Sequence, residues 1–150
     1  DAAVMRLLLA ALALLIAGGA GYIRLAPSDP ARWHVAPRLA ALEKGGPSGQ
    51  VLTVEGGAAV QLATADPASL LARLDGIALA TPRTQRLAGS VAEGRITWIS
   101  RSLFWGFPDY TTAQVTPEGL VIHARQRFGS NDWGVNAARL EIWLTRLSRS

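Results

Sequence analysis

The segment from Leu7 to Ile23 carries no charged side chain over seventeen residues, and Arg6 and Arg24 close it at its two ends. Such a run restricts the backbone to a helix, because a helix satisfies its own hydrogen bonds within one segment inside a bilayer. Seventeen residues, at about 1.5 Å each, reach the lower limit for crossing the hydrocarbon core. With Arg24 extending outward to the interface, the sequence predicts a transmembrane anchor over residues 1–24.

Two interpretations of this segment are open. A cleaved secretory leader has a basic start, a short apolar run and an exit of small residues, and Arg6, Leu7–Ile16 and residues 17–20 match that outline. We expect a retained anchor instead, and its small residues suit close packing against another helix. These residues are Ala17, Gly18, Ala20 and Gly21.

The orientation of the anchor follows from its flanks. A short basic tail before an apolar run is the usual export arrangement, so we expect the domain on the periplasmic side of a bacterial inner membrane, in single-pass topology. Counting Arg24, Arg32 and Arg38 alone would place the domain in the cytoplasm. The bacterial assignment rests on composition, since fourteen of the fifteen basic residues are arginine and the chain is rich in alanine and glycine.

The remaining chain, about 125 residues, suits one domain with one core. Hydrophobic residues make up 49% and charged residues 17% of the chain, a balance that excludes a disordered protein. The net charge is +4, but the arginines are scattered rather than gathered in a basic tract, so we expect no nucleic-acid partner. The absence of cysteine excludes disulfides and thiol chemistry.

Four of the eight prolines lie between residues 25 and 49, which predicts a Pro-rich linker with a short helical turn before an α+β domain at residues 50–150. Trp33 and His34 in this linker are expected to lie along the membrane or to cover an edge of the domain. Asp66-Pro67 predicts the start of a helix that Asp75-Gly76 ends.

Strands and a last helix complete the predicted domain. Strands are expected at residues 50–55, 59–63, 86–91, 95–104, 110–115 and 120–128. Asn131 and Asp132 predict the cap of a helix over residues 133–147, whose apolar spacing gives the buried stripe Trp133, Ala137, Leu140, Leu144 and Leu147. The result is an antiparallel sheet packed by a long C-terminal helix, an α+β fold.

The residues that carry chemistry do not form a recognisable catalytic set. His34 and His123 are the only histidines, and no metal-ligand spacing, phosphate loop or nucleophile elbow accompanies them. We therefore predict no catalytic residue, no metal ligand and no cofactor, and expect that the protein is not an enzyme. Asp109 and Asp132 each open a turn, where a carboxylate bonds backbone amides; acid–base catalysis would need them close together.

Arginines and one tryptophan are the other candidates for interaction. Arg101, Arg125 and Arg127 are expected to gather on one side of the sheet, opposite Asp109 or Asp132, either in structural ion pairs or as an anion site. Trp105 lies in an aromatic stretch and is either an exposed wedge or a core residue.

The stretches Ser100–Tyr110 and Ala124–Arg139 are similar to the family called domain of unknown function 1499. Its pattern has a phenylalanine–proline–aspartate turn, an arginine-bearing strand, a loop with glycine, serine, aspartate and asparagine, and an arginine-bearing helix. This chain matches it with Phe107, Pro108, Asp109, Arg125, Arg127, Gly129, Ser130, Asp132, Gly134, Asn136 and Arg139. Asn131 is inserted, and Tyr110 stands where a second acidic residue is common. The similarity covers residues 82–147, with a weaker match at 28–34, and implies a membrane-anchored bacterial envelope protein.

Two function classes follow. The first is a non-enzymatic accessory or assembly subunit of a larger inner-membrane complex, such as a respiratory or photosynthetic one, with membrane lipid and other subunits as partners. The second is a ligand-binding module that holds a lipid or small apolar molecule between the sheet and the last helix, in a pocket lined by Trp98, Phe104 and Trp143. A filled core at that place would exclude this pocket.

Overall fold

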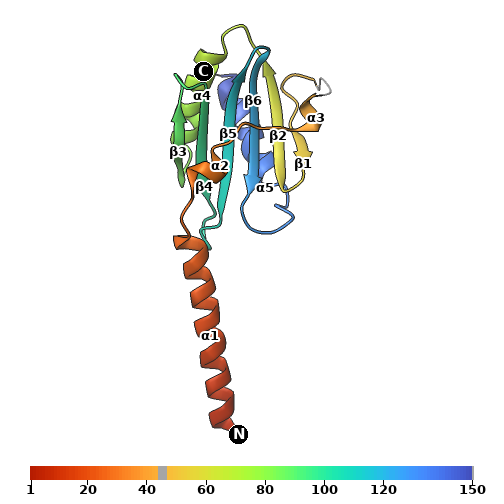
Figure 1. Ribbon diagram of the computed structural model, residues 1–150. Coiled ribbons are helices and arrows are strands. Elements are labelled where there is room, and N and C mark those ends of the chain that lie inside the picture. The colour runs from red at the N-terminus through yellow and green to blue at the C-terminus, as the bar shows by residue number, and fades with distance from the viewer. Residues whose placement is uncertain (44–46, 150) are drawn as a thin grey trace.

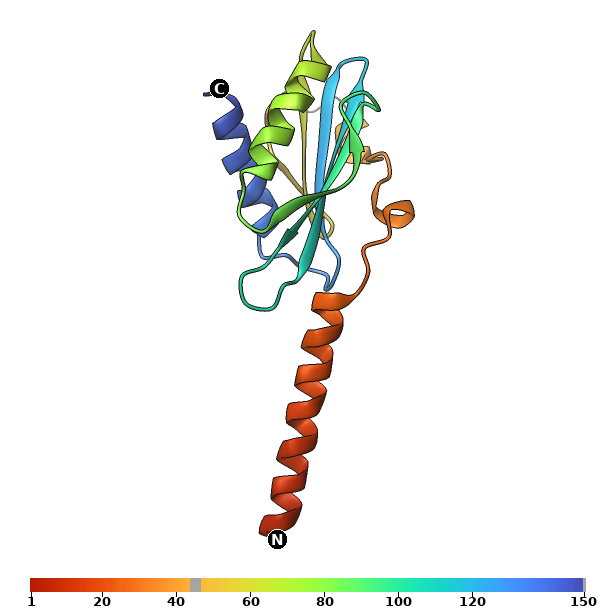
Figure 2. The ribbon, with the colours of Figure 1, turned by 90° about the vertical axis from the view of Figure 1, so that its left-hand side faces the viewer.

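A single long helix, α1 (Ala2–Leu25), projects from the domain in the computed structural model, which describes residues 1–43 and 47–149 (Figures 1 and 2). The Asp1 carboxylate caps its first turn by accepting from the Ala3 amide at 3.0 Å. None of its residues is buried, and its length and composition suffice to cross a membrane. The predicted apolar helix is confirmed.

The domain is built on one antiparallel sheet of six strands in the order β1-β2-β6-β5-β4-β3. Its strands are β1 (Leu52–Val54), β2 (Gly57–Ala63), β3 (Thr84–Ser90), β4 (Arg95–Arg101), β5 (Pro108–Thr116) and β6 (Gly119–Gln126). Two helices, α4 (Pro67–Leu79) and α5 (Val135–Leu147), cover the same face (Figure 2). The predicted α+β fold with a packed C-terminal helix is confirmed.

The inner face of the sheet, the one under α4 and α5, carries the main core. Alternation along the strands turns Ile96 and Trp98 of β4 toward the helices, and both are fully buried. Trp98 meets Trp143 of α5 edge to face, with ring centroids 5.7 Å apart. Leu71 and Leu74 of α4 complete the same cluster.

Helix α4 continues beyond its predicted end. Asp75-Gly76 was expected to stop it, but the helix runs to Leu79. The Asp75 carboxylate is buried, accepts from the Trp98 indole N–H at 2.9 Å and pairs with Arg86 of β3. A carboxylate satisfied by partners on two strands no longer competes for the helix backbone, so the turn signal is overridden.

Two predicted boundaries move at the end of the sheet next to α1. Strand β4 ends at Arg101 rather than Phe104, because Ser102 and Phe107 close a loop with two hydrogen bonds of 3.0 and 2.9 Å. Helix α5 begins at Val135 rather than Trp133, since Trp133 and Gly134 have φ angles of 53° and 78°. Trp133 is 88% exposed, so its place in the predicted buried stripe is wrong.

The outer face of the sheet is crossed by a segment that we call the strap, residues 26–42, which includes the short helix α2 (Pro30–Trp33) and leads into α3 (Ala40–Glu43). Trp33 is only 6% exposed and stacks on Tyr110 of β5 with ring centroids 4.0 Å apart. His34 bonds Thr97 at 2.9 Å and Glu93 at 2.8 Å. Of their two predicted places, Trp33 and His34 therefore take the one on the domain, where they cover the outer face of the sheet.

Candidate functional site

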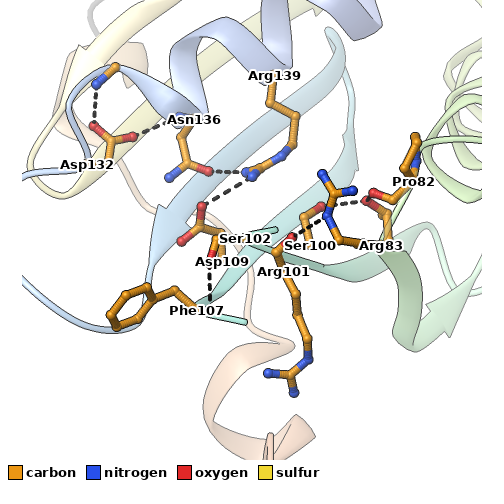
Figure 3. A network of polar contacts seen from close by, with 12 residues as sticks. Pro82, Arg83, Ser100, Arg101, Ser102, Phe107, Asp109, Asp132, Asn136 and Arg139 are labelled. Atoms are coloured by element: carbon orange, nitrogen blue, oxygen red, sulfur yellow. Dashed lines mark hydrogen bonds and ion pairs between the residues drawn. The ribbon is translucent and has the colours of Figure 1, made fainter. Parts of the chain in front are cut away.

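The family-like residues meet where β5 begins and α5 begins, at the end of the sheet next to α1 (Figure 3). Asp109 pairs in register with Ser100 and Gln126, so its side chain points to the inner face. Arg139 of α5 reaches the Asp109 carboxylate at 3.2 Å and donates to the Asn136 side-chain oxygen at 2.5 Å. The Asp109 and Arg139 side chains are each 14% exposed. The ion pair joins the last helix to the sheet.

Asp132 organises the loop in front of α5. Its carboxylate accepts from the backbone amides of Gly134 at 3.1 Å and Asn136 at 2.9 Å. Burial alone would raise the pKa of Asp132, but these backbone hydrogen bonds outweigh it and hold the pKa below its usual value. Asp132 thus stays charged and accepts from amides at the start of the helix, but the N-cap residue of α5 is Gly134, which corrects the prediction that Asp132 is the cap.

Asp109 has the opposite electrostatics. Burial raises the pKa of Asp109 above its usual value even though the Arg139 guanidinium opposes that shift, and the nearby Asp132 charge adds to it. The pKa of Asp109 is therefore raised and that of Asp132 lowered. The Arg139 guanidinium, which donates to Asp109, also donates to the side chain of Asn136. Among the described residues, no group of three or more His, Asp or Glu side chains is placed to hold a metal ion.

A cavity of about 360 Å³ opens beside this network. Asp109, Arg139 and Asp132 line its polar side, and Phe107 and Trp133 belong to its apolar side. Among the described residues, Trp98, Phe104 and Trp143 do not line a common pocket, which corrects the predicted lining. An open cavity of about 370 Å³ between β2, α4 and α5 is lined by Leu62, Leu70, Leu144 and Leu147 instead. Trp98 and Trp143 fill their space by contact with each other, and Phe104 lies outside the core, 81% exposed.

The three predicted arginines hold backbone segments in place. Arg125 donates to the Trp33 carbonyl at 3.2 Å and lies over the Trp33 ring at 4.9 Å. Arg127 donates to the Pro27 carbonyl at 2.9 Å, and Arg101 donates to the Gly106 carbonyl at 3.0 Å. The prediction that they face Asp109 or Asp132 is wrong, since none of the three forms an ion pair within the described residues and Arg139 is the partner of Asp109.

Apolar side chains are exposed around the junction of α1 and the domain. The loop after β4 presents Leu103, Phe104 and Trp105, which are 61%, 81% and 53% exposed. Arg24, in the last turn of α1, reaches the Phe104 carbonyl at 3.5 Å. Tyr22 of α1 meets the Phe128 ring edge to face at 6.3 Å. The helix and the aromatic loop thus present neighbouring apolar surfaces, and Trp105 is the exposed alternative of its two predicted states.

Sequence reasoning missed Arg24 and Arg83 as site residues. Both line a second cavity at this end of the domain, of about 290 Å³, together with Arg101. Arg24 was taken only as the end of the apolar run. Arg83 carries no local signal beyond Pro82 before it, and its φ of 56° is set by contacts with β4 that no sequence pattern records.

The comparison with known proteins agrees with this arrangement. No curated protein matches the chain. The family model described as protein of unknown function (DUF1499) matches residues 48–147, which include the whole sheet, both packed helices and the Asp109–Arg139 pair. On that match, the chain belongs to the DUF1499 family of proteins of unknown function.

Proposed function

We propose that this chain is a non-enzymatic, membrane-anchored accessory or assembly subunit of a larger bacterial inner-membrane complex, with its domain on the periplasmic side. The observation that carries the proposal is the exposed apolar surface that runs from α1 onto the loop of Leu103, Phe104 and Trp105. In water this surface would be costly, because exposed contiguous apolar patches mark membrane or protein contacts. A membrane covers the helix, and its interface accepts the aromatic loop.

The length of α1 fits this placement. Its 24 residues extend about 36 Å at the rise of an α-helix, against about 30 Å for the hydrocarbon core. Arg24 then lies at the depth of the lipid headgroups, one turn from the domain. The aromatic loop beside it supplies the side chains that favour this depth in membrane proteins.

One side of α1 is suited to a partner helix. At 3.6 residues per turn, positions 10, 13, 17 and 21 lie within about 80° of one another. They are Ala10, Ala13, Ala17 and Gly21, while Leu8, Leu12 and Leu15 lie on the opposite side. Small residues let helix backbones approach closely inside a bilayer, so this side supports packing against the helix of another subunit.

The polar network supports a role without catalysis. Asp109, Arg139, Asn136 and Asp132 bond one another or nearby backbone, which ties α5 to the sheet and positions the loops on either side. Each charged group has a structural partner, and these contacts account for the arrangement by themselves.

The first experiment is affinity purification of the tagged full-length chain from native membranes in mild detergent, with mass spectrometry of co-purifying proteins. Gly21→Leu is the test variant and Gly19→Leu its matched control, since neither added side chain meets an atom within 4 Å and the two glycines face nearly opposite ways. We expect stoichiometric membrane subunits with the wild type and Gly19→Leu, and at least a tenfold loss with Gly21→Leu. Recovery of the chain alone, or equal recovery with both variants, would contradict the proposal.

The same preparation tests anchoring and orientation. A retained anchor and a cleaved leader cannot be told apart by length and composition. The mass of the purified chain distinguishes them, because cleavage removes the apolar segment. Because the chain has no cysteine, Glu141→Cys on the exposed side of α5 provides a single labelling site. We expect a maleimide that cannot cross the inner membrane to label this cysteine from the periplasmic side in intact cells. Labelling only after cell lysis would place the domain in the cytoplasm.

A further inference from the structure

We propose that the cavity of about 290 Å³ beside the end of α1 binds the phosphate of an anionic phospholipid headgroup. Three arginines from separate parts of the chain line it: Arg24 from α1, Arg83 from the turn before β3, and Arg101 from the end of β4. The proposal rests on the membrane anchoring argued above and adds a lipid class to it. Figure 3 shows Arg83 and Arg101 at the edge of the sheet, with the Arg101 side chain extending toward α1.

The charge of this cavity is not balanced by the protein. None of its lining residues is acidic, and none of the three arginines forms an ion pair among the described residues. The guanidinium groups of Arg83 and Arg101 point in different directions, toward Ser100 and toward α1 (Figure 3), and an anion in the cavity would lower the repulsion among the three like charges. Arg24 and Arg83 are exposed and Arg101 is only partly exposed, so Arg101 gains most from an anion.

The donors that face the cavity are not used up by the fold. Each arginine donates to one backbone carbonyl: Arg24 to Phe104, Arg83 to Arg101 and Arg101 to Gly106. A guanidinium has five N–H groups, so most remain for a ligand. Arginine binds phosphate through pairs of N–H groups. A carboxylate can accept the same pairs, but phosphate has more acceptor oxygens to offer to three arginines.

One of the two non-glycine residues with positive φ among the described residues lines this cavity. Arg83 has a φ of 56°, which non-glycine residues adopt rarely. The conformation is held from β4, since the Arg101 amide donates to the Arg83 carbonyl at 3.0 Å and Arg83 Nε donates back to the Arg101 carbonyl at 3.1 Å. Strained residues of this kind occur preferentially at ligand sites, where they aim a side chain.

The position of the cavity selects a lipid over a soluble phosphate. Arg24 is in the last turn of the membrane-crossing helix, and Leu103, which also lines the cavity, belongs to the exposed aromatic loop. A phosphate at this depth is a headgroup, and its acyl chains would lie against α1. Anionic headgroups gain about fivefold in affinity for each nearby basic residue.

The test places the full-length chain in nanodiscs with equal amounts of phosphatidylcholine and phosphatidylglycerol, followed by native mass spectrometry of the retained lipids. We expect the wild type to retain phosphatidylglycerol in excess, and Arg83→Gln or Arg101→Gln to lower that excess about fivefold each. Arg146→Gln, an exposed arginine at the far end of α5, removes the same charge away from the cavity and is the control. The Arg83→Gln result is the more direct one, because Arg101 also donates to the Gly106 carbonyl and its substitution can change the loop.

Equal retention of the two lipids by the wild type, or an equal loss with Arg146→Gln, would overturn the proposal. Adding inorganic phosphate to the full chain in neutral detergent distinguishes a free phosphate ion from a lipid headgroup as the ligand. A rise in unfolding temperature that Arg83→Gln abolishes would assign the cavity to a free phosphate and overturn the lipid. A chain that fails to enter nanodiscs contradicts the anchor itself, whereas one that enters without lipid preference contradicts only this inference.

Discussion

The two faces of the sheet are built in different ways. The inner face is dry and packed under two helices, with Ile96 and Trp98 fully buried. The outer face is covered by one thin strap, whose Trp33 stacks on Tyr110 and packs with Ile99 and Leu87 in a small second cluster, beside polar groups. A chain of contacts crosses it from Glu93 through His34 and Thr97 to Thr112. The inner face therefore supplies the stability of the fold, and the outer face binds the segment that leads to α1.

This contrast fits the placement of the domain. The strap connects α1 to the sheet, and its backbone carbonyls at Pro27 and Trp33 are held by Arg127 and Arg125. Hydrogen bonds from arginine to a backbone carbonyl fix position without requiring a deep apolar core. Arg125 of β6 and Arg127 just after it thus fix the strap that leads to α1, while Arg139 fixes the last helix relative to the sheet.

The largest effect is expected from the inner face. Trp98→Ala removes the ring that packs on Trp143 and leaves the buried Asp75 carboxylate without its indole donor. Truncating a buried tryptophan costs about 3–5 kcal/mol, so the free energy of unfolding should fall by that amount. Urea unfolding of the full chain in mild detergent, followed by circular dichroism, measures it. A loss below about 1 kcal/mol would mean that the inner face does not carry the stability.

The next effect comes from His123 on the outer face, beneath the strap. Burial, with the Arg125 charge adding to it, lowers the pKa of His123 to about 4, against about 6.5 in an unfolded chain. Arg38 lines the same cavity and adds no negative charge to offset this. Between those two pH values the unfolded chain binds a proton that the folded chain does not, so stability falls as the pH is lowered through that window.

The size of this effect is about 2–3 kcal/mol between pH 7 and pH 4.5. His123→Gln removes the titrating group, and comparison of its urea unfolding with that of the wild type at both pH values isolates the contribution of His123 from that of the carboxylates. The wild type should lose more stability than the variant on acidification. The same loss in both proteins would show that His123 is not buried as a neutral side chain.

A smaller and local effect is expected from Trp33→Ala. The strap can leave the sheet without opening the core under α4 and α5, so the loss of global stability should be about 2 kcal/mol, below that of Trp98→Ala. Hydrogen exchange should become faster in the strap and in β4 and β5 while the amides of α4 and α5 stay protected. Uniformly faster exchange over both faces would remove the distinction between them.

The same distinction explains how far the sequence could predict the molecule. The apolar run, the Asp66-Pro67 helix start and the alternation of β4 to β6 are local patterns, and each produced an element close to its predicted place. Asp75 and Trp33 depend on partners 23 and 77 residues away, Trp98 and Tyr110, so no local pattern records their burial. The cation-lined cavity is likewise assembled from distant segments, and only Arg101 of its arginines was selected in advance.

The smallest effect is expected at the edge of the inner face. Trp133 fits the helical spacing of the core stripe, yet its positive φ turns it out of α5 and leaves it 88% exposed. Trp133→Ser should therefore change the free energy of unfolding by less than about 0.5 kcal/mol, as surface substitutions do. Leu140→Ser on the same helix, fully inside the core, is the matched control and should cost several kcal/mol. Equal losses would mean that the core includes the loop before α5. A large difference would mean that the core ends at the Asp109–Arg139 pair, where the exposed surface next to α1 begins.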